Sequence, residues 1–489
     1  MGKNLLLYFA VLLVCGAGLY FTLQYGARLQ PGAVPSEEST QSEPLNVFPG
    51  ATPAAGASAG GAISVLVENL QHPLGILLLQ LTVILVAARL TGVLFQKLGQ
   101  PAVIGEMVAG IVLGPSLLGL LLPAAQAFIF PEASMGTLRL LSQIGVVLYM
   151  FVIGVELDLQ HLRQRAHAAV LVSHASIILP FCLGTILALF IYPTLAPAHT
   201  SFLAFALFMG IAMSITAFPV LARIIEERGL SKSHLGNTAI ACAAVDDVTA
   251  WCLLAFVVAI AKADSLGGSL LTLVLAMLFI GVMLFLLKPR AGRILGEAMH
   301  SEKHSKGMVA VVLIFVFVAA LSTEIIGIHA LFGAFLAGVI IPTNPRLRAF
   351  LRERLETFSS VFLLPLFFAF TGLRTQIGLL NEVHSWLICA GIIAVAIIGK
   401  LGASTLAARW TGMSWHESFS LGALMNTRGL MELIVLDIGY DLGILSPRIF
   451  AMMVLMALVT TLMTAPVLAL LERAKRWKPA RTRIEEFHV

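Results

Sequence analysis

The chain has 489 residues, of which 58% are hydrophobic and only 12% are charged, and its formal net charge is +5. This composition excludes an ordinary soluble domain and indicates a polytopic membrane protein. Because the positive charges gather in alternate predicted loops, we attribute the charge excess to membrane topology and expect no nucleic-acid partner.

The first predicted element is an apolar segment over residues 4–24, directly after Lys3. Residues 1–26 are interpreted as either a cleaved signal peptide or a retained N-terminal transmembrane helix. The stretch that follows is rich in Pro, Ser, Gly and Ala, which predicts a disordered extracytoplasmic linker over residues 27–70. A membrane domain is predicted over residues 71–472, and a basic cytoplasmic tail over residues 473–489.

The membrane domain contains a series of apolar stretches of about twenty residues, enough to cross roughly 30 Å of hydrocarbon as helices. Lys and Arg gather in every second loop and in the tail, which predicts a cytoplasmic C-terminus. The thirteen expected core spans cover residues 73–97, 101–121, 137–157, 167–192, 201–225, 235–262, 266–287, 307–326, 328–342, 355–374, 385–409, 415–438 and 447–471.

Two of these spans contain residues that interrupt a regular helix. A lone proline kink is ordinary in a membrane helix, whereas one interrupted helix in each half of a chain is typical of inverted-repeat transporters. We expect the repeats over approximately residues 73–262 and 307–471. The interrupting residues are Ser214, Thr216, Ala217 and Pro219 in the fifth span, and Asn426, Thr427, Arg428 and Gly429 in the twelfth.

Among the charged residues within predicted spans, Asp246, Asp247 and Lys400 are the strongest functional candidates. Asp246 and Asp247 are adjacent in the sixth, and charged side chains at bilayer depth are costly unless they have a function. Because neighbouring helical positions point about 100° apart, one carboxylate is expected to face a fixed counter-charge and the other to face water. Lys400, in the eleventh span, is the candidate counter-charge; the alternative is that its side chain reaches a membrane surface.

Other acidic residues support weaker predictions. Glu106 and Glu156 are expected either to line an inner funnel or to cap helix ends, and Glu432 is a third funnel candidate. Glu432 is one helical turn from Arg428, so the two either pair with each other or hold the interrupted helix in place. The five cysteines have no metal-ligand spacing, and we predict no cofactor and no metal beyond a transported ion.

Several strings together resemble the monovalent cation:proton antiporter superfamily, and most closely the branch with plant cation/H+ exchangers and bacterial K+(Na+)/H+ antiporters. The resemblance covers about 400 residues, from Leu74 to Leu471. It is carried by PAVIGEMVAGIVLGPSLLG at 101–119, LYMFVIGVELDL at 148–159, SITAFPVLARII at 214–225, AAVDDVTAW at 243–251, IHALFGAFLAGVIIP at 328–342, LPLFFAFTGLRT at 364–375 and NTRGLMELIVLDIG at 426–439.

The resemblance implies an all-α protein with about 13 core helices in two inverted repeats, two crossing broken helices, and assembly as a homodimer. It implies that Asp247 binds the cation and the proton, that Asp246 pairs with Lys400, and that Thr216 lies in the first broken helix. The plant-type branch commonly has Asn-Asp at the position of Asp246 and Asp247. The double acid of this chain accompanies electrogenic exchange in the wider superfamily.

The predicted function is therefore exchange of K+ or Na+ for protons by alternating access, serving pH homeostasis in a bacterial inner membrane. The proton and the cation are expected to compete for Asp247, with oxygen ligands from Thr216 and backbone carbonyls around the cation. A sodium-coupled symporter of an organic anion and a cation efflux channel are the alternatives. An intramembrane enzyme is disfavoured, because DDVTAW supplies neither carboxylates from two helices nor spaced clusters for Mg2+.

Overall fold

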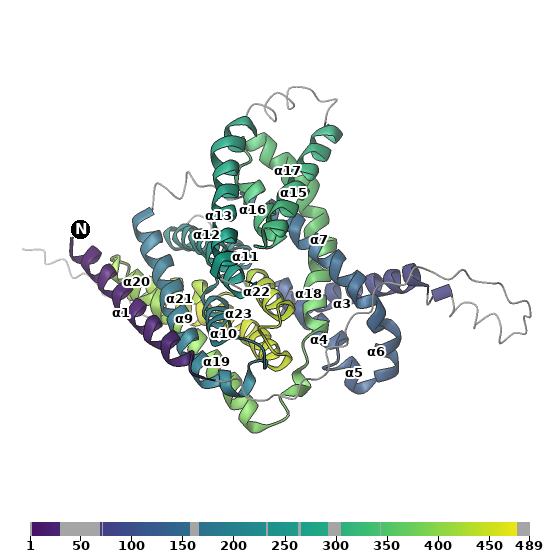
Figure 1. Cartoon of the computed structure of the whole chain (residues 1–489), viewed down its shortest axis with the longest axis horizontal. Coiled ribbons are helices and arrows are strands. Elements are labelled where there is room, and N and C mark those ends of the chain that lie inside the picture. Colours follow the sequence, from purple (N-terminus) through teal and green to yellow (C-terminus); the bar gives the residue numbers. More distant parts are fainter. Residues whose placement is uncertain are drawn as a thin grey trace, which may run out of the picture.

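The computed structural model describes residues 2–29, 69–70, 72–156, 166–230, 233–262, 266–291, 305–342 and 344–476. Within these ranges every regular element is a helix (Figure 1). Ten helices in the described part are long and apolar enough to cross a membrane, or eleven when the bent pair α21 and α22 counts as one span. The chain is an all-helical integral membrane protein, as its composition predicts.

The helices before residue 300 have the following bounds: α1 (Gly2–Gly26), α3 (Pro73–Lys97), α4 (Ala102–Leu113), α5 (Leu118–Leu121), α6 (Pro123–Ile129), α7 (Glu132–Glu156), α9 (Ala166–Leu195), α10 (Phe202–Ser214), α11 (Phe218–Glu227), α12 (His234–Lys262), α13 (Leu266–Gly281) and the π-helix η1 (Val282–Leu287). Those after it are α15 (Ser305–Ile326), α16 (Ala330–Val339), α17 (Pro345–Phe358), the π-helix η3 (Ser359–Leu363), α18 (Leu364–Leu373), the 3-10 turn η4 (Ile377–Leu379), α19 (Val383–Ile397), the π-helix η5 (Ile398–Gly402), α20 (Ala403–Trp410), α21 (Trp415–Met425), α22 (Leu430–Asp441) and α23 (Pro447–Arg476).

The helices fall into two groups by their packing. We call α9 to α12 with α19 to α23 the core group, and α3 to α7 with α13 to α18 the scaffold group. Each helix packs mainly on members of its own group, as α9 does on α10, α12 and α20, and as α7 does on α16, α17 and α18. Contacts between the groups are made chiefly by α12 with α13, α18 with α22, and α23 with α4 and η4. In Figure 1 the upper part of the molecule is formed by α13, α15, α16 and α17 of the scaffold group.

Two span boundaries differ from those predicted. The stretch expected over 328–342 forms a helix of only ten residues, Ala330–Val339, because the left-handed backbone at Gly327 and His329 delays its start. The span expected over 355–374 begins ten residues earlier, at Pro345. Asn344 caps that helix, and α17 buries Leu347, Leu351 and Leu355 while its charged residues face outward. The mean hydropathy of such an amphipathic helix is low, so hydropathy alone does not predict it as part of the span.

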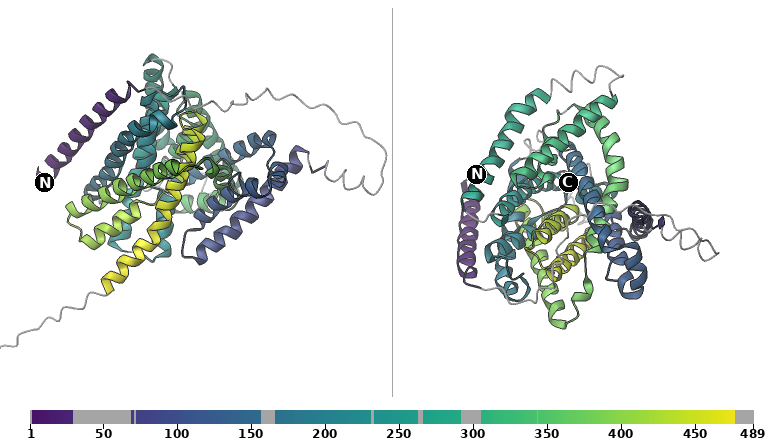
Figure 2. Two further views of the ribbon diagram at one scale, coloured as in Figure 1. Left: turned by 90° about the horizontal axis from the view of Figure 1, so that it is seen from below. Right: turned by 45° about the vertical axis from the view of Figure 1, so that its right-hand side comes forward.

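The N-terminal segment forms α1, which lies at the edge of the molecule against α9 and α10 (Figures 1 and 2). Its final residue, Gly26, faces the ring of Phe202 so closely that a side chain there would not fit. Most of the predicted linker and of the basic tail, residues 30–68, 71 and 477–489, lies outside the described residues.

Candidate functional site

The two interrupted helices meet at their breaks. The first ends at Ser214 and resumes at Phe218 as α11, and the second ends at Met425 and resumes at Leu430 with a bend of 41°. The backbone N–H of Ala217 donates to the carbonyl of Thr427 over 3.0 Å, and the hydroxyl oxygen of Thr216 lies 3.0 Å from the carbonyl oxygen of Met425. Each break therefore satisfies backbone groups that the other leaves free, as irregular backbone at membrane depth requires.

Arg428 belongs to the second break, and its side chain reaches the C-terminal end of α10, the first half of the first broken helix. Its guanidinium donates to the carbonyls of Ala212 and Met213 over 2.7 Å each, and to the carboxylate of Glu432 over 2.6 Å. All of these groups are buried, and Arg428 and Glu432 are fully shielded from solvent. Since the last carbonyls of a helix lack intrahelical donors, this cation caps α10 and complements the negative end of its dipole. Both predicted roles are therefore seen together. Arg428 pairs with Glu432, and its guanidinium also holds the broken helix in place.

We expect Arg428→Lys to lower stability by roughly 2 kcal/mol, because a lysine cannot donate to both carbonyls and the carboxylate from one planar fork. The measurement is thermal unfolding in detergent, with the exposed Arg346→Lys as the matched control. Equal melting temperatures for the two variants would show that the fork geometry contributes nothing.

The remaining residues of the second break contact α23. The amide of Asn426 lies 3.6 Å from Met463 Sδ, and the Thr427 hydroxyl lies 3.4 Å from that of Thr464. The Thr461 hydroxyl donates to the carbonyl of Arg428 over 2.6 Å. At Gly429 a side chain would meet Val220 of α11, so the crossing favours glycine there on packing grounds. These contacts attach the second break to α23 and pack it closely against α11.

Asp246 and Lys400 form a fully buried ion pair next to the place where the two broken helices meet. Lys400 Nζ lies 2.9 Å from Asp246 Oδ2, and both side chains have no exposed surface. Lys400 lies in the π-helical turn η5, a local widening that often occurs at functional positions. Its ammonium also donates to the carbonyl of Ser176 over 3.1 Å and to that of Ser214, the last residue of α10. It therefore does not reach a membrane surface.

Three hydroxyl groups complete the surroundings of Asp246. Ser173 donates to Oδ1, Ser176 donates to Oδ2 over 2.9 Å, and Thr216 donates to Oδ2 over 2.7 Å. With these donors and the ammonium, the carboxylate of Asp246 is saturated and held in one orientation. Thr216 thus contacts Asp246 and a backbone carbonyl, and no hydrogen bond joins its hydroxyl to Asp247.

Asp247 lies next to this ion pair but is not part of it. Its side chain is 1% exposed, and neither carboxylate oxygen accepts a hydrogen bond from any described residue. The backbone N–H of Phe218, at the positive end of α11, faces this carboxyl group. The two aspartates therefore point into different surroundings, as helix geometry predicts. The expectation that the second would face water was wrong for this conformation, because Asp247 is buried.

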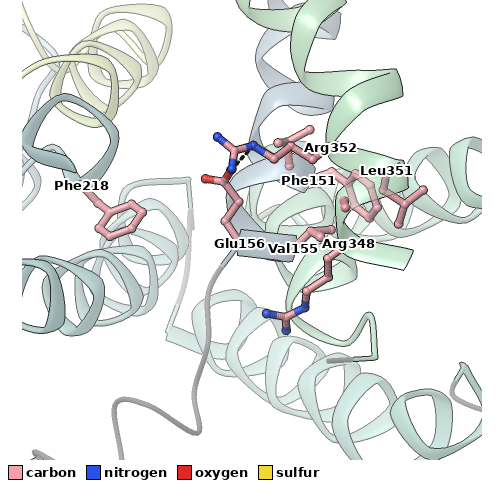
Figure 3. Close-up of a pocket in the computed structure, with 9 residues that line it drawn as sticks. Phe151, Val155, Glu156, Phe218, Arg348, Leu351 and Arg352 are labelled. Carbon is pink, nitrogen blue, oxygen red and sulfur yellow. Dashed lines mark ion pairs between the residues drawn. The ribbon is translucent and has the colours of Figure 1, made fainter. Parts of the chain in front are cut away.

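A cavity of about 470 Å³ is lined by Phe218, the residue whose backbone N–H faces Asp247, and Asp247 itself does not line it. Figure 3 shows the Phe218 side chain on one wall, with residues of α7 and α17 on the other. Glu156, the last residue of α7, lines this cavity and pairs with Arg352 over 3.2 Å. Glu106 is partly buried on α4 and does not line it, and Glu432 is buried against Arg428. Of the three predicted funnel acids, the structure brings only Glu156 to this cavity.

Several residues of the site were not predicted. Ser173 and Ser176 bind Asp246, Phe218 lines the cavity, and Arg352 pairs with Glu156. The serines are spaced three apart in an apolar helix, so both hydroxyls share one face, which is the signal that would have found them. Nothing comparable marks Phe218, since apolar residues surround it in the sequence.

Comparison with known proteins gives a consistent result. A family model described as "Sodium/hydrogen exchanger, transmembrane" matches residues 82–470. The Na+/H+ antiporter NhaS4 of Synechocystis is 46% identical over 393 residues, covering 80% of this chain and 96% of that protein. The cation/H+ antiporter 17 of Arabidopsis thaliana is 40% identical, and the K+/H+ antiporter 1 of Saccharomyces cerevisiae is 33% identical. Each matches 82% of this chain, which spans only 49% and 46% of their lengths.

A solved structure supports the fold. The sodium proton antiporter MjNhaP1 of Methanocaldococcus jannaschii aligns with a TM-score of 0.56 at 16% identity, covering 81% of this chain and 96% of that one. At this identity the likeness concerns the arrangement of helices alone.

Proposed function

Because the chain belongs to the sodium/hydrogen exchanger family, we propose that it exchanges a monovalent cation for protons across the membrane. The relatives include proteins named as Na+/H+ and as K+/H+ antiporters, so Na+ and K+ are both candidate substrates. Family membership also favours a transporter over an enzyme.

The observation that carries this proposal is the contrast between two adjacent carboxylates. Asp246 has a cationic partner and three hydroxyl donors, whereas Asp247 has no protein hydrogen bond in the described structure. A buried carboxylate without such donors is stabilised either by a proton or by a cation. Asp247 therefore has the properties of a site that two substrates can occupy in turn.

Obligatory exchange follows from the charge of this site. With a proton or a cation bound, the site at Asp247 is neutral overall. The broken helices that hold it can then move relative to an apolar barrier without exposing a charge to it. With neither bound, the ionised carboxylate would be carried through the barrier at a large desolvation cost. The substrates then compete for one carboxylate and cross in opposite directions, by alternating exposure of the site to the two sides.

We further propose that exchange is electrogenic. Asp247 alone binds one proton, so moving two protons for each cation requires a second group that gives up and regains a proton. The Asp246–Lys400 pair is adjacent, buried and ionisable. When the pair breaks, the Lys400 ammonium would give up one proton, and it would regain a proton when the pair re-forms with the Asp246 carboxylate. We also propose a homodimer in a bacterial inner membrane with the C-terminus in the cytoplasm.

Proton flux in proteoliposomes tests the proposed function. A pH gradient is imposed, and Na+, K+ or Li+ is added in turn, with choline at equal ionic strength as the control cation. We expect proton movement that depends on at least one alkali cation and that responds to an imposed membrane potential. No cation-dependent flux would contradict antiport; uptake of an organic anion driven by Na+ would instead support the symporter alternative.

Phe218 provides a further prediction about access. Its side chain lines the cavity while its backbone N–H faces Asp247. We propose that the ring separates solvent in the cavity from the carboxylate. We expect Phe218→Ala to lower the cation concentration needed for half-maximal flux from the cavity side, because the barrier to the site is smaller. Phe151→Ala, which enlarges the same cavity away from Asp247, is the control. Equal effects of the two substitutions would count against a separating role for Phe218.

A further inference from the structure

Three ion pairs between described residues join the scaffold group to the core group, and all lie at one end of the molecule. Arg374, directly after α18, pairs with Asp437 over 3.1 Å and with Asp441 over 2.6 Å. Arg139, near the start of α7, pairs with Asp441 over 2.7 Å. Both arginines belong to the scaffold group, and both aspartates lie on α22, the second half of a broken helix in the core group.

This cluster is better held than an ordinary surface ion pair. The side chain of Arg374 is only 16% exposed, and its guanidinium lies 4.3 Å from the ring centre of Tyr440 and 5.3 Å from that of Phe370. Asp437 also accepts a hydrogen bond of 2.6 Å from the hydroxyl of Thr371. Several partners and low exposure together distinguish such a cluster from exposed pairs, which contribute little.

The opposite end of the same interface is open. Helix α7 runs from the ion-pair cluster at Arg139 to Glu156, which lines the cavity described above. At 1.5 Å per residue these two positions are about 25 Å apart along the helix. At the Glu156 end, a cavity of about 470 Å³ lies between α7 and α17 of the scaffold group and Phe218 of the core group. The core group and the scaffold group are thus joined by ion pairs at one end of α7 and separated by the cavity at its other end.

We propose that Arg139, Arg374, Asp437 and Asp441 form a latch that closes the face opposite the cavity and that must break in each transport cycle. The inference rests on the proposed alternating exposure of Asp247. For the site to open toward the latch side, α22 must part from α7 and α18, and the three ion pairs oppose this movement together with the Thr371–Asp437 hydrogen bond. By the predicted topology the latch lies on the outer side.

Cysteine labelling of the full-length protein tests the latch at both ends. Thr371→Cys places a thiol in the latched interface, where Thr371 is 1% exposed, and Ala349→Cys places one at the cavity. Each cysteine variant is combined with Arg374→Gln or with Asp441→Asn. Its reaction with a water-soluble maleimide is followed by mass spectrometry of the peptide that contains the introduced cysteine. Arg448→Gln removes a charge at the same end, from α23, and is the control.

We expect both latch variants to label Thr371→Cys at least tenfold faster and Ala349→Cys more slowly, because opening one face closes the other. Faster labelling at Thr371→Cys without slower labelling at Ala349→Cys would mean local loosening, and it would overturn the latch. So would unchanged labelling, or an equal effect of Arg448→Gln. Labelling requires no ion flux, so reciprocal labelling in a protein without cation:proton exchange would retain the latch and remove the exchange function.

Discussion

Asp247→Asn is expected to abolish cation-dependent proton flux while leaving the fold intact. An amide binds neither a proton at neutral pH nor a monovalent cation with the strength of a carboxylate, so both proposed substrates lose their site. Stability should be unchanged or higher, because the substitution keeps the shape of a side chain that has no protein hydrogen bond and removes its buried charge. The measurements are proton flux in proteoliposomes and thermal unfolding in detergent.

The combination of lost activity and retained stability is the informative outcome. Residues kept for function often cost stability, whereas residues kept for structure do not. Glu353→Gln, on the exposed face of α17, is the matched control and should retain flux. Substantial flux in Asp247→Asn would contradict the assignment. A strongly lowered melting temperature would indicate that Asp247 has a structural partner.

The sequence was sufficient for the class of protein, and it singled out charged residues that the structure places close together. Hydropathy located helices over nearly all of the expected spans, and the cost of buried charge singled out Asp246, Asp247 and Lys400 without any coordinates. The same energetic argument suggested that Lys400 needs an acidic partner, and the structure places it 2.9 Å from Asp246. Sequence patterns succeed here because an isolated charge in an apolar run admits few structural explanations.

The partners of those residues were less accessible to sequence reasoning. Arg428 donates to the backbone carbonyls of Ala212 and Met213. Because every residue has a backbone carbonyl, no pattern of side chains in the sequence can predict such a contact. Thr216 was expected near the cation but its hydroxyl binds Asp246, a choice set by how the two broken helices cross. The predicted bounds were wrong at α17, which is amphipathic, and at α16, which has only ten residues, because hydropathy predicts long and uniformly apolar helices best.

Lys400→Met is expected to destabilise the protein by about 3–5 kcal/mol, because it leaves Asp246 as a buried carboxylate without its counter-charge. The double variant Asp246→Asn with Lys400→Met should recover most of this loss, since it leaves no unpaired charge. The hydroxyls of Ser173, Ser176 and Thr216 can also bond an amide. Thermal unfolding in detergent measures both effects, with the exposed Lys97→Met as the control.

The double variant also separates the structural role of the ion pair from its role in transport. It retains Asp247, so it should still exchange one cation for one proton, but it lacks the second ionisable group. Flux in this variant should therefore lose its dependence on the membrane potential, which a potential clamped across the proteoliposome measures directly. If the flux of the double variant still responds to the potential as in the wild type, the second proton does not come from the Asp246–Lys400 pair. The Asp246–Lys400 pair would then only neutralise buried charge next to the broken helices. The second proton exchanged for each cation would have to come from another group in the membrane domain.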